Sequence, residues 1–305
     1  MSKRQNKLKK LIILGFQLVK QRGISRYSSK FSKKTFTQHQ FLVMGILKTE
    51  LKMNYRDFRD WLEFSTEAVY LLKLKKIPHF TTLQKFLQRF DPVVFDILIS
   101  SIFSQIVRNK LIDIAVDSSG FTSSYSSKYY VMRINRETTY RNFMKTSILV
   151  DPKTKALIAV KCRKGPAHDT KDFIPLLRKA NRNIKQRIRN VIADKAYDSS
   201  KNFYFIEKEL HANAVIPLRY YRTRRAGRHT IRKHRPLDPD KTVYGRRNMA
   251  ETVFSAIKRK FGGDLQSRLI EVKKKEIKMK ALVYNLCILM TKKSYFIFIG
   301  FLQSP

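Results

Sequence analysis

The chain has few of the residues that mark several common protein classes. Its 305 residues include two cysteines, Cys162 and Cys287, in separate apolar contexts and without CxxC spacing. This pattern predicts small core side chains in a reducing compartment, and it argues against a disulfide framework or a zinc site. The six histidines show no metal-ligand spacing. No Ser-His-Asp arrangement, phosphate-binding glycine loop or dinucleotide fingerprint is recognisable.

Long hydrophobic runs are also missing. Residues 11–16 form an apolar stretch that is shorter than a usual signal-peptide core and lacks a convincing cleavage site. The apolar run Tyr295–Leu302 is too short to span a bilayer. We therefore expect a cytoplasmic protein, associated with the nucleoid if it binds DNA, without a membrane partner.

Acidic residues are scarce. The chain has 23 Asp and Glu against 64 Lys and Arg, a formal net charge of +41. Such an excess repels itself in a compact fold unless a polyanion neutralises it, which predicts a nucleic acid as partner. Membrane-surface binding usually concentrates charge on one amphipathic segment, whereas here the charge extends along the whole chain. The 43% hydrophobic residues indicate a folded protein.

The first part of the chain, residues 1–109, is predicted to be a small all-α region. Residues 1–35 are basic with weak structural signals, and helical periodicity follows. The expected N-caps are Thr37, Asn54 and Thr81 or Thr82, with a further helix after Pro92. Short basic helices are compatible with a helix-turn-helix DNA reader and equally with a dimerisation module.

Residues 110–305 have a different pattern, in which strands come first and then alternate with helices. Strands are expected at 111–116, 129–134, 144–150, 156–162, 190–193 and 214–218, and helices after Thr170 and over 199–210. The pattern alone predicts a mixed α/β domain.

Two carboxylates directly follow short apolar runs in this part of the chain. Asp117 follows residues 112–116, and Asp194 follows 191–193. Ligands gather at strand ends in α/β sheets, so both are candidate site residues. Other acids are weaker candidates: Asp113 could face the same groove or solvent, and Asp198 and Asp169 are expected to cap helices.

A third carboxylate lies in the segment Tyr244-Gly-Arg-Arg247-Asn-Met-Ala-Glu251, with Lys258 seven residues after Glu251. On one continuous α-helix, Tyr244, Arg247, Glu251 and Lys258 would share a stripe about 60° wide beside the apolar face. A carboxylate flanked by cations and a tyrosine suits a metal ion and a phosphodiester together. The structural alternative is a capping box from Asn248 to Glu251 with an Arg247–Glu251 helix pair.

The order Asp117, Asp194, Glu251, together with Tyr-x2-Arg-x3-Glu-x6-Lys, resembles the DDE transposases of prokaryotic insertion sequences, over roughly residues 110–290. The resemblance implies a ribonuclease H-like catalytic domain. It also implies that the three acids are catalytic and bind Mg²⁺ or Mn²⁺, two ions per site. The resemblance further implies that Tyr244 stacks on a displaced base. It implies in the same way that Arg247 and Lys258 contact phosphates near the cut.

Residues 219–236 form a basic loop between the second and third carboxylates. Charge at this density favours contact with phosphates. The expected DNA-binding side chains there are Arg222, Arg224, Arg225, Arg228, Arg232 and Lys233.

The resulting hypothesis is a transposase that binds the double-stranded terminal repeats of its own element, cleaves each end and joins it to target DNA. A homodimer in the synaptic complex is implied by the reaction. The alternatives are a ribonuclease H-like nuclease without joining activity and an inactive DNA-binding remnant of a transposase.

Overall fold

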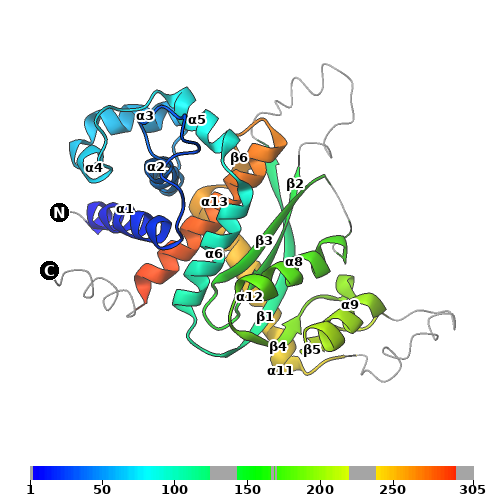
Figure 1. Ribbon diagram of the computed structural model, residues 1–305. Helices are drawn as coiled ribbons and strands as arrows, with labels where there is room; N and C mark the ends of the chain where they lie inside the picture. Colours follow the sequence, from blue (N-terminus) through cyan, green and yellow to red (C-terminus); the bar gives the residue numbers. More distant parts are fainter. Residues whose placement is uncertain (1–2, 124–142, 166–167, 169, 220–237, 293–305) are drawn as a thin grey trace, which may run out of the picture. The chain divides into compact units, whose positions relative to one another are not determined.

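The computed structural model describes residues 3–123, 143–165, 168, 170–219 and 238–292 (Figure 1). Contacts within the chain divide it into two compact units, residues 1–98 with 260–305 and residues 99–259. The C-terminal segment thus clusters with the N-terminal helices, whereas the sequence placed all of 110–305 in the catalytic domain. Whether these units correspond to separate functions stays a prediction.

The unit of residues 1–98 and 260–305 is helical in its described part, apart from one two-residue strand. Its elements are α1 (Lys3–Gln21), α2 (Gln38–Leu51), α3 (Tyr55–Phe64), α4 (Thr66–Leu71), α5 (Phe80–Arg89), the start of α6 (Pro92–Ile106), β6 (Asp264–Leu265) and α13 (Ile270–Thr291). Helix α2 packs against α1, α5 and α13.

The caps of these helices were predicted in part. Thr37 caps α2 in a capping box with Gln40, and the Asn54 side chain accepts hydrogen bonds from two backbone amides at the start of α3, as expected. The cap of α5 was predicted wrongly: His79 occupies it, so the helix begins before Thr81. The 19-residue α1 was not predicted, because the basic N-terminal residues obscured its apolar face.

Helix α13 buries several lysines. Nζ of Lys275 donates to the Gln88 carbonyl at 2.7 Å, and Nζ of Lys278 lies 2.9 Å from Oδ2 of Asp96. Nζ of Lys280 donates to the carbonyls of Gly262 and Asp264. Buried cations require such partners, so part of the positive charge holds the helices together and is not available to a polyanion.

The unit of residues 99–259 is built on a mixed sheet in which β3, β2, β1, β4 and β5 lie side by side in that order. Strands β3, β2 and β1 are antiparallel, and β1, β4 and β5 are parallel. The strands are β1 (Leu111–Ser123), β2 (Met144–Val150), β3 (Leu157–Lys164), β4 (Arg187–Ile192) and β5 (Asn213–Val215). This confirms the mixed α/β class; the strand expected at 129–134 lies outside the described residues.

The connections of this unit are helical. They are the end of α6, α8 (Thr170–Asn183), the 3-10 turn η1 (Lys195–Tyr197), α9 (Ser200–Tyr204), the π-helical turn η2 (Phe205–Glu209), α11 (Lys241–Tyr244), the 3-10 turn η4 (Gly245–Arg247) and α12 (Asn248–Phe261), whose last two residues belong to the other unit. Helix α8 packs on β2 and β3 (Figure 1).

The faces of β1 are distinguished by their contacts. Ser118 Oγ lies 2.7 Å from Ser147 Oγ and 3.0 Å from the hydroxyl of Tyr197, whose ring packs 4.9 Å from that of Phe173 in α8. Ser118 therefore points to the face covered by α8. Because side chains alternate along a strand, Asp113, Asp117 and Ser119 point to the opposite face.

Two smaller predictions were wrong. Cys162 and Cys287 were expected in the core, but each is only half-buried. Asp198 does not cap α9, whose N-cap is Ser199; instead its Oδ2 accepts a hydrogen bond from the Arg219 amide at 2.7 Å. Asp198 thus binds the backbone of Arg219, the last described residue before 220–237. Asp169 lies outside the described residues.

Candidate active site

Asp117 lies on β1, and Asp194 follows the end of the neighbouring parallel strand β4 by two residues. The register pairs Ala115 of β1 with Ile192 of β4, so two further residues along each chain bring Asp117 level with Asp194. Asp117 does not end its strand, as the sequence suggested, because β1 continues to Ser123 along β2. It does lie just past the last residue that β1 pairs with β4, where the two strands separate.

Asp194 begins a turn as well as facing the site. Its Oδ1 accepts a hydrogen bond from the Ala196 amide at 2.7 Å and thereby caps η1. The buried Tyr197 at the end of η1 reaches Ser118, the residue after Asp117. The Asp-Lys-Ala-Tyr motif therefore fixes the end of β4 against β1.

The segment with Tyr244, Arg247 and Glu251 is not one α-helix. The 3-10 turn η4 separates α11 from α12. In a 3-10 turn, residues three apart are eclipsed, so Tyr244 and Arg247 lie closer to one line than an α-helix would place them. The capping-box interpretation is wrong, since Asn248 has helical angles (φ −57°, ψ −17°) and does not cap α12. The helix pair is confirmed: Arg247 Nη2 lies 2.6 Å from Glu251 Oε1.

The charges of the other two carboxylates act on Asp117. Burial raises the pKa of Asp117 to about 6, and the nearby negative charges of Glu251 and Asp194 act in the same direction. The Ser118 amide and the Arg247 guanidinium oppose this rise. The structure thus brings all three predicted acids into one electrostatic cluster around Asp117, although they come from three separate elements.

Arg247 is the cation of this cluster. Burial lowers its pKa, but the hydrogen bond to Glu251 and the negative charges of Glu251 and Asp117 act in the opposite direction, and the net shift is upward. Its side chain is 19% exposed, against 55% for Glu251. The buried Nε of Arg247 has no hydrogen-bond partner within the described ranges.

Lys258 lies further along the same face of β1. Its Nζ donates to Ser119 Oγ at 2.8 Å and lies 5.5 Å from the centre of the Phe121 ring. Ser119 is two residues beyond Asp117, so α12 follows β1, with Glu251 near Asp117 and Lys258 near Ser119. The signature side chains Arg247, Glu251 and Lys258 therefore face one strand.

The donor set of the cluster is made of carboxylate oxygens, which suit hard divalent cations such as Mg²⁺ or Mn²⁺. Across the residues that the structure describes, no group of three or more His, Cys, Asp or Glu side chains is close enough to hold a metal ion. In this arrangement Arg247 supplies the positive charge between Asp117 and Glu251.

The expected DNA-binding residues of the loop lie outside the described residues. Arg222, Arg224, Arg225, Arg228, Arg232 and Lys233 all fall within 220–237. Arg219 is described, and its Nε donates to the Lys195 carbonyl at 2.9 Å. Arg219, the last described residue before 220–237, therefore lies beside the turn that Asp194 caps.

Sequence reasoning missed the part that Asp113 plays beside this site. Asp113 is 7% exposed, and its carboxylate accepts hydrogen bonds from Arg189 Nε, Asn190 Nδ2 and Arg246 Nη1. Burial raises its pKa, but these bonds outweigh burial and the net pKa is lowered. Asp113 precedes Asp117 by four residues, so the two side chains share a face of the strand. The sequence around Asp113 contains no signal that identifies Arg189, Asn190 and Arg246 as its partners.

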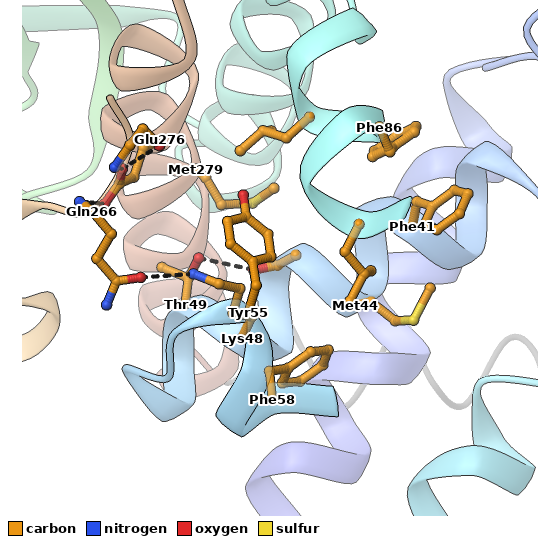
Figure 2. A pocket seen from close by; sticks show the side chains of 14 residues that line it. Phe41, Met44, Lys48, Thr49, Tyr55, Phe58, Phe86, Gln266, Glu276 and Met279 are labelled. Atoms are coloured by element: carbon orange, nitrogen blue, oxygen red, sulfur yellow. Dashed lines mark hydrogen bonds between the residues drawn. The ribbon is translucent and has the colours of Figure 1, made fainter. Parts of the chain in front are cut away.

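The helical unit contains a separate small cavity, shown in Figure 2, with a volume of about 40 Å³. Lys48 Nζ lies there 3.1 Å from Gln266 Oε1 and 4.3 Å from the centre of the Tyr55 ring. Burial lowers the pKa of Lys48 to about 8. The space admits only a few water-sized molecules, so it is not a candidate for DNA binding or catalysis.

Comparison with known proteins agrees with the geometry. A family model described as a transposase DDE domain matches residues 108–286. This range includes all three carboxylates and the segment from Tyr244 to Lys258. No curated protein matches the chain. Within the described residues, no helix is both long and apolar enough to cross a bilayer.

Proposed function

Because the chain belongs to the DDE transposase family, we propose that it cuts DNA at the ends of its own mobile element and joins the new ends to target DNA. The observation that carries the proposal is the cluster of Asp117, Asp194 and Glu251 around one guanidinium. The charges of Glu251 and Asp194 raise the pKa of Asp117, so the three acids repel one another, and a merely structural role does not explain their convergence.

Asp117, Asp194 and Glu251 would hold the divalent ions, Mg²⁺ or Mn²⁺. When bound, such ions supply a deprotonated oxygen nucleophile and relieve the charge on the leaving oxygen. Arg247 would release part of its interaction with Glu251 as the cations arrive.

The neighbouring side chains would hold the DNA end. Arg247, whose side chain is 19% exposed, would donate to a phosphate oxygen beside the cut. Lys258 can exchange its neutral Ser119 partner for a phosphate at little cost, because the hydroxyl carries no charge. Tyr244, half-buried at the end of α11, would stack on a base displaced from the terminal pair.

Other parts of the molecule would bind duplex DNA outside the catalytic site. The loop 219–236, including Arg222, Arg224, Arg225, Arg228, Arg232 and Lys233, would contact phosphates beside the Asp194 turn. A homodimer would hold two ends together, and the helices of residues 1–109 would read the terminal repeats or form the dimer. The protein would then be associated with the nucleoid.

The test is an assay with labelled duplexes from either side of the gene, incubated with the protein and a target plasmid in Mg²⁺. A transposase releases a 3′-hydroxyl at the element end and joins it to the plasmid. A nuclease cuts without joining, and an inactive remnant shifts the DNA in a gel without cutting it. Glu209→Gln, which removes an exposed ion pair with Arg178, is the control that should keep both activities.

A further inference from the structure

Asp113 lies on the strand that carries Asp117 and binds the two segments that precede Asp194 and Glu251. It lies on β1, four residues before Asp117. Arg189 and Asn190 of β4, which it binds, precede Asp194 by five and four residues. Arg246 of η4 precedes Glu251 by five. Each carboxylate of the cluster therefore follows, by four or five residues, either Asp113 itself or a residue that Asp113 binds.

The backbone of β4 is shaped for this contact. The register shifts between Ile112 and Asp113, so that Ile112 pairs with Ile188 while Asp113 pairs with Asn190. Arg189 is the additional residue of β4 at this irregularity. A bulge re-aims side chains locally, and here it lets two consecutive residues, Arg189 and Asn190, reach one carboxylate.

The link to the turn before α12 is short and charged. Arg246 Nη1 lies 2.6 Å from Asp113 Oδ2, and Arg189 Nε lies 2.9 Å from Oδ1. The two arginine side chains are 45% and 50% exposed, whereas Asp113 is buried. The Asp113 carboxylate is thus buried in the sheet. Its ion pair with Arg246 attaches the turn η4, which also contains Arg247, to β1.

We propose that Asp113 is a positioning residue, which sets the separation of Asp117, Asp194 and Glu251 through its bonds to Arg189, Asn190 and Arg246. The proposal rests on the proposed function for its meaning in catalysis. It does not make Asp113 a metal ligand, since its oxygens are occupied by Arg189, Asn190 and Arg246. Residues that orient metal ligands typically change metal affinity or activity by about 10–100-fold when they are replaced.

The chain offers a matched control. Asp172 is 1% exposed and binds two cations, with Arg163 Nη2 at 2.6 Å and Lys161 Nζ at 3.4 Å. It joins α8 to β3, and neither element contains a member of the acidic cluster. Asp172→Asn therefore removes a buried charge of the same kind without touching the proposed positioning network.

The experiment compares wild type, Asp113→Asn, Arg246→Gln and Asp172→Asn. Amide hydrogen exchange of the segment 244–251, measured by mass spectrometry without DNA or metal, reports the attachment of η4. We expect faster exchange there in Asp113→Asn and Arg246→Gln and unchanged exchange in Asp172→Asn. Unchanged exchange in the first two variants would overturn the proposal, whatever the activity of the protein.

Mn²⁺ binding, followed by electron paramagnetic resonance, and strand cleavage in Mg²⁺ complete the test. Asp113→Asn should weaken Mn²⁺ binding and slow cleavage about 10–100-fold, with end binding unchanged, while Asp172→Asn leaves all three as in wild type. Equal effects of Asp113→Asn and Asp172→Asn would reduce Asp113 to a structural residue. If wild type neither binds Mn²⁺ nor cuts DNA, the proposed function fails, and the exchange result still decides whether Asp113 holds the turn.

Arg246→Gln also covers the case in which Asp113→Asn folds poorly, because Arg246 is half-exposed. If Arg246 acts through Asp113, the double variant should cleave as slowly as Asp113→Asn alone. An additional loss of end binding in the double variant would instead show that Arg246 binds DNA directly, which contradicts the proposal.

Discussion

Asp113 and Asp117 lie four residues apart on one strand face, yet their carboxyl groups have opposite shifts in pKa. Replacement of each by asparagine should therefore change stability in opposite directions. At pH 7 we expect Asp117→Asn to stabilise the metal-free protein and Asp113→Asn to destabilise it. Both variants remove one negative charge from a highly cationic chain, so a general charge effect cannot produce opposite signs.

The magnitude for Asp117 follows from its pKa, which burial and the neighbouring acids raise from 3.8 to about 6. Two pKa units correspond to about 3 kcal/mol. Because the side chain is partly exposed, solvent screening reduces this to about 1–2 kcal/mol. The folded state holds the proton more tightly than the unfolded state, so this cost is absent below pH 3.8. It develops as the pH rises to about 6 and is complete above it.

The sign for Asp113 is the reverse. Its pKa is lower in the folded protein, so its contribution to stability is present above the unfolded pKa and is lost as the pH falls through the folded value. Leaving Arg189 and Arg246 without their carboxylate should cost about 1–3 kcal/mol at pH 7.

The assay is urea unfolding of wild type and both variants at a series of pH values from 4 to 8. The stability advantage of Asp117→Asn over wild type should grow between pH 4 and 6 and then remain level. Addition of Mg²⁺ should stabilise wild type and not Asp117→Asn, because a ligand of the folded state raises its stability. If Asp117→Asn is no more stable than wild type at pH 7, the electrostatic cost of the cluster, and with it the functional argument, is refuted.

Three further predictions concern DNA contact and the helical unit. Tyr244→Ala should impair cleavage of paired ends, and a mismatch or abasic site beside the cut should partly restore it, because displacing an unpaired base costs less; no restoration would assign the tyrosine to packing. Serine replacement of the basic residues in 219–235 should flatten the dependence of DNA affinity on salt, measured by gel shift, by about 0.9 in log–log slope for each lost phosphate contact; an unchanged slope would mean that this loop faces away from DNA. Lys48→Met should stabilise the protein by about 1–2 kcal/mol at pH 7 in thermal unfolding, because burial lowers the pKa of Lys48 to about 8 and its charged form is costly; the gain should shrink between pH 8 and 10.5, and a loss of stability at pH 7 would show that its contacts with Gln266 and Tyr55 matter more.

The candidate site could be predicted from the sequence because each acid has a local signal. Asp117 and Asp194 follow apolar β-branched runs, and Glu251 has its spaced partners. The extension of β1 past Asp117 was not predictable, since Ser118 and Ser119 are neutral to strand formation by themselves and depend on pairing with β2. The 3-10 turn before α12 was also missed; its Arg246 binds the distant Asp113, a contact that no local pattern reveals.

The helices were predicted where a polar cap precedes an apolar periodicity, as at Thr37 and Asn54. They were missed where tertiary partners decide. Helix α13 buries Lys275, Lys278 and Lys280, which count as surface residues in any hydrophobic pattern. Their partners are backbone carbonyls and Asp96, and the hydrophobic periodicity of the sequence does not predict these contacts.

The central claim is that Asp117, Asp194 and Glu251 form one metal-dependent site for cutting and joining DNA. The most direct measurement is 3′-end cleavage and strand transfer in Mg²⁺ by wild type, Asp117→Asn, Asp194→Asn and Glu251→Gln, with gel shifts to confirm DNA binding. We expect wild type to cut and join, and each variant to bind the ends while losing both activities. Near-normal cleavage by any one variant would remove that residue from the site, and cutting without joining by wild type would contradict the assignment as a transposase.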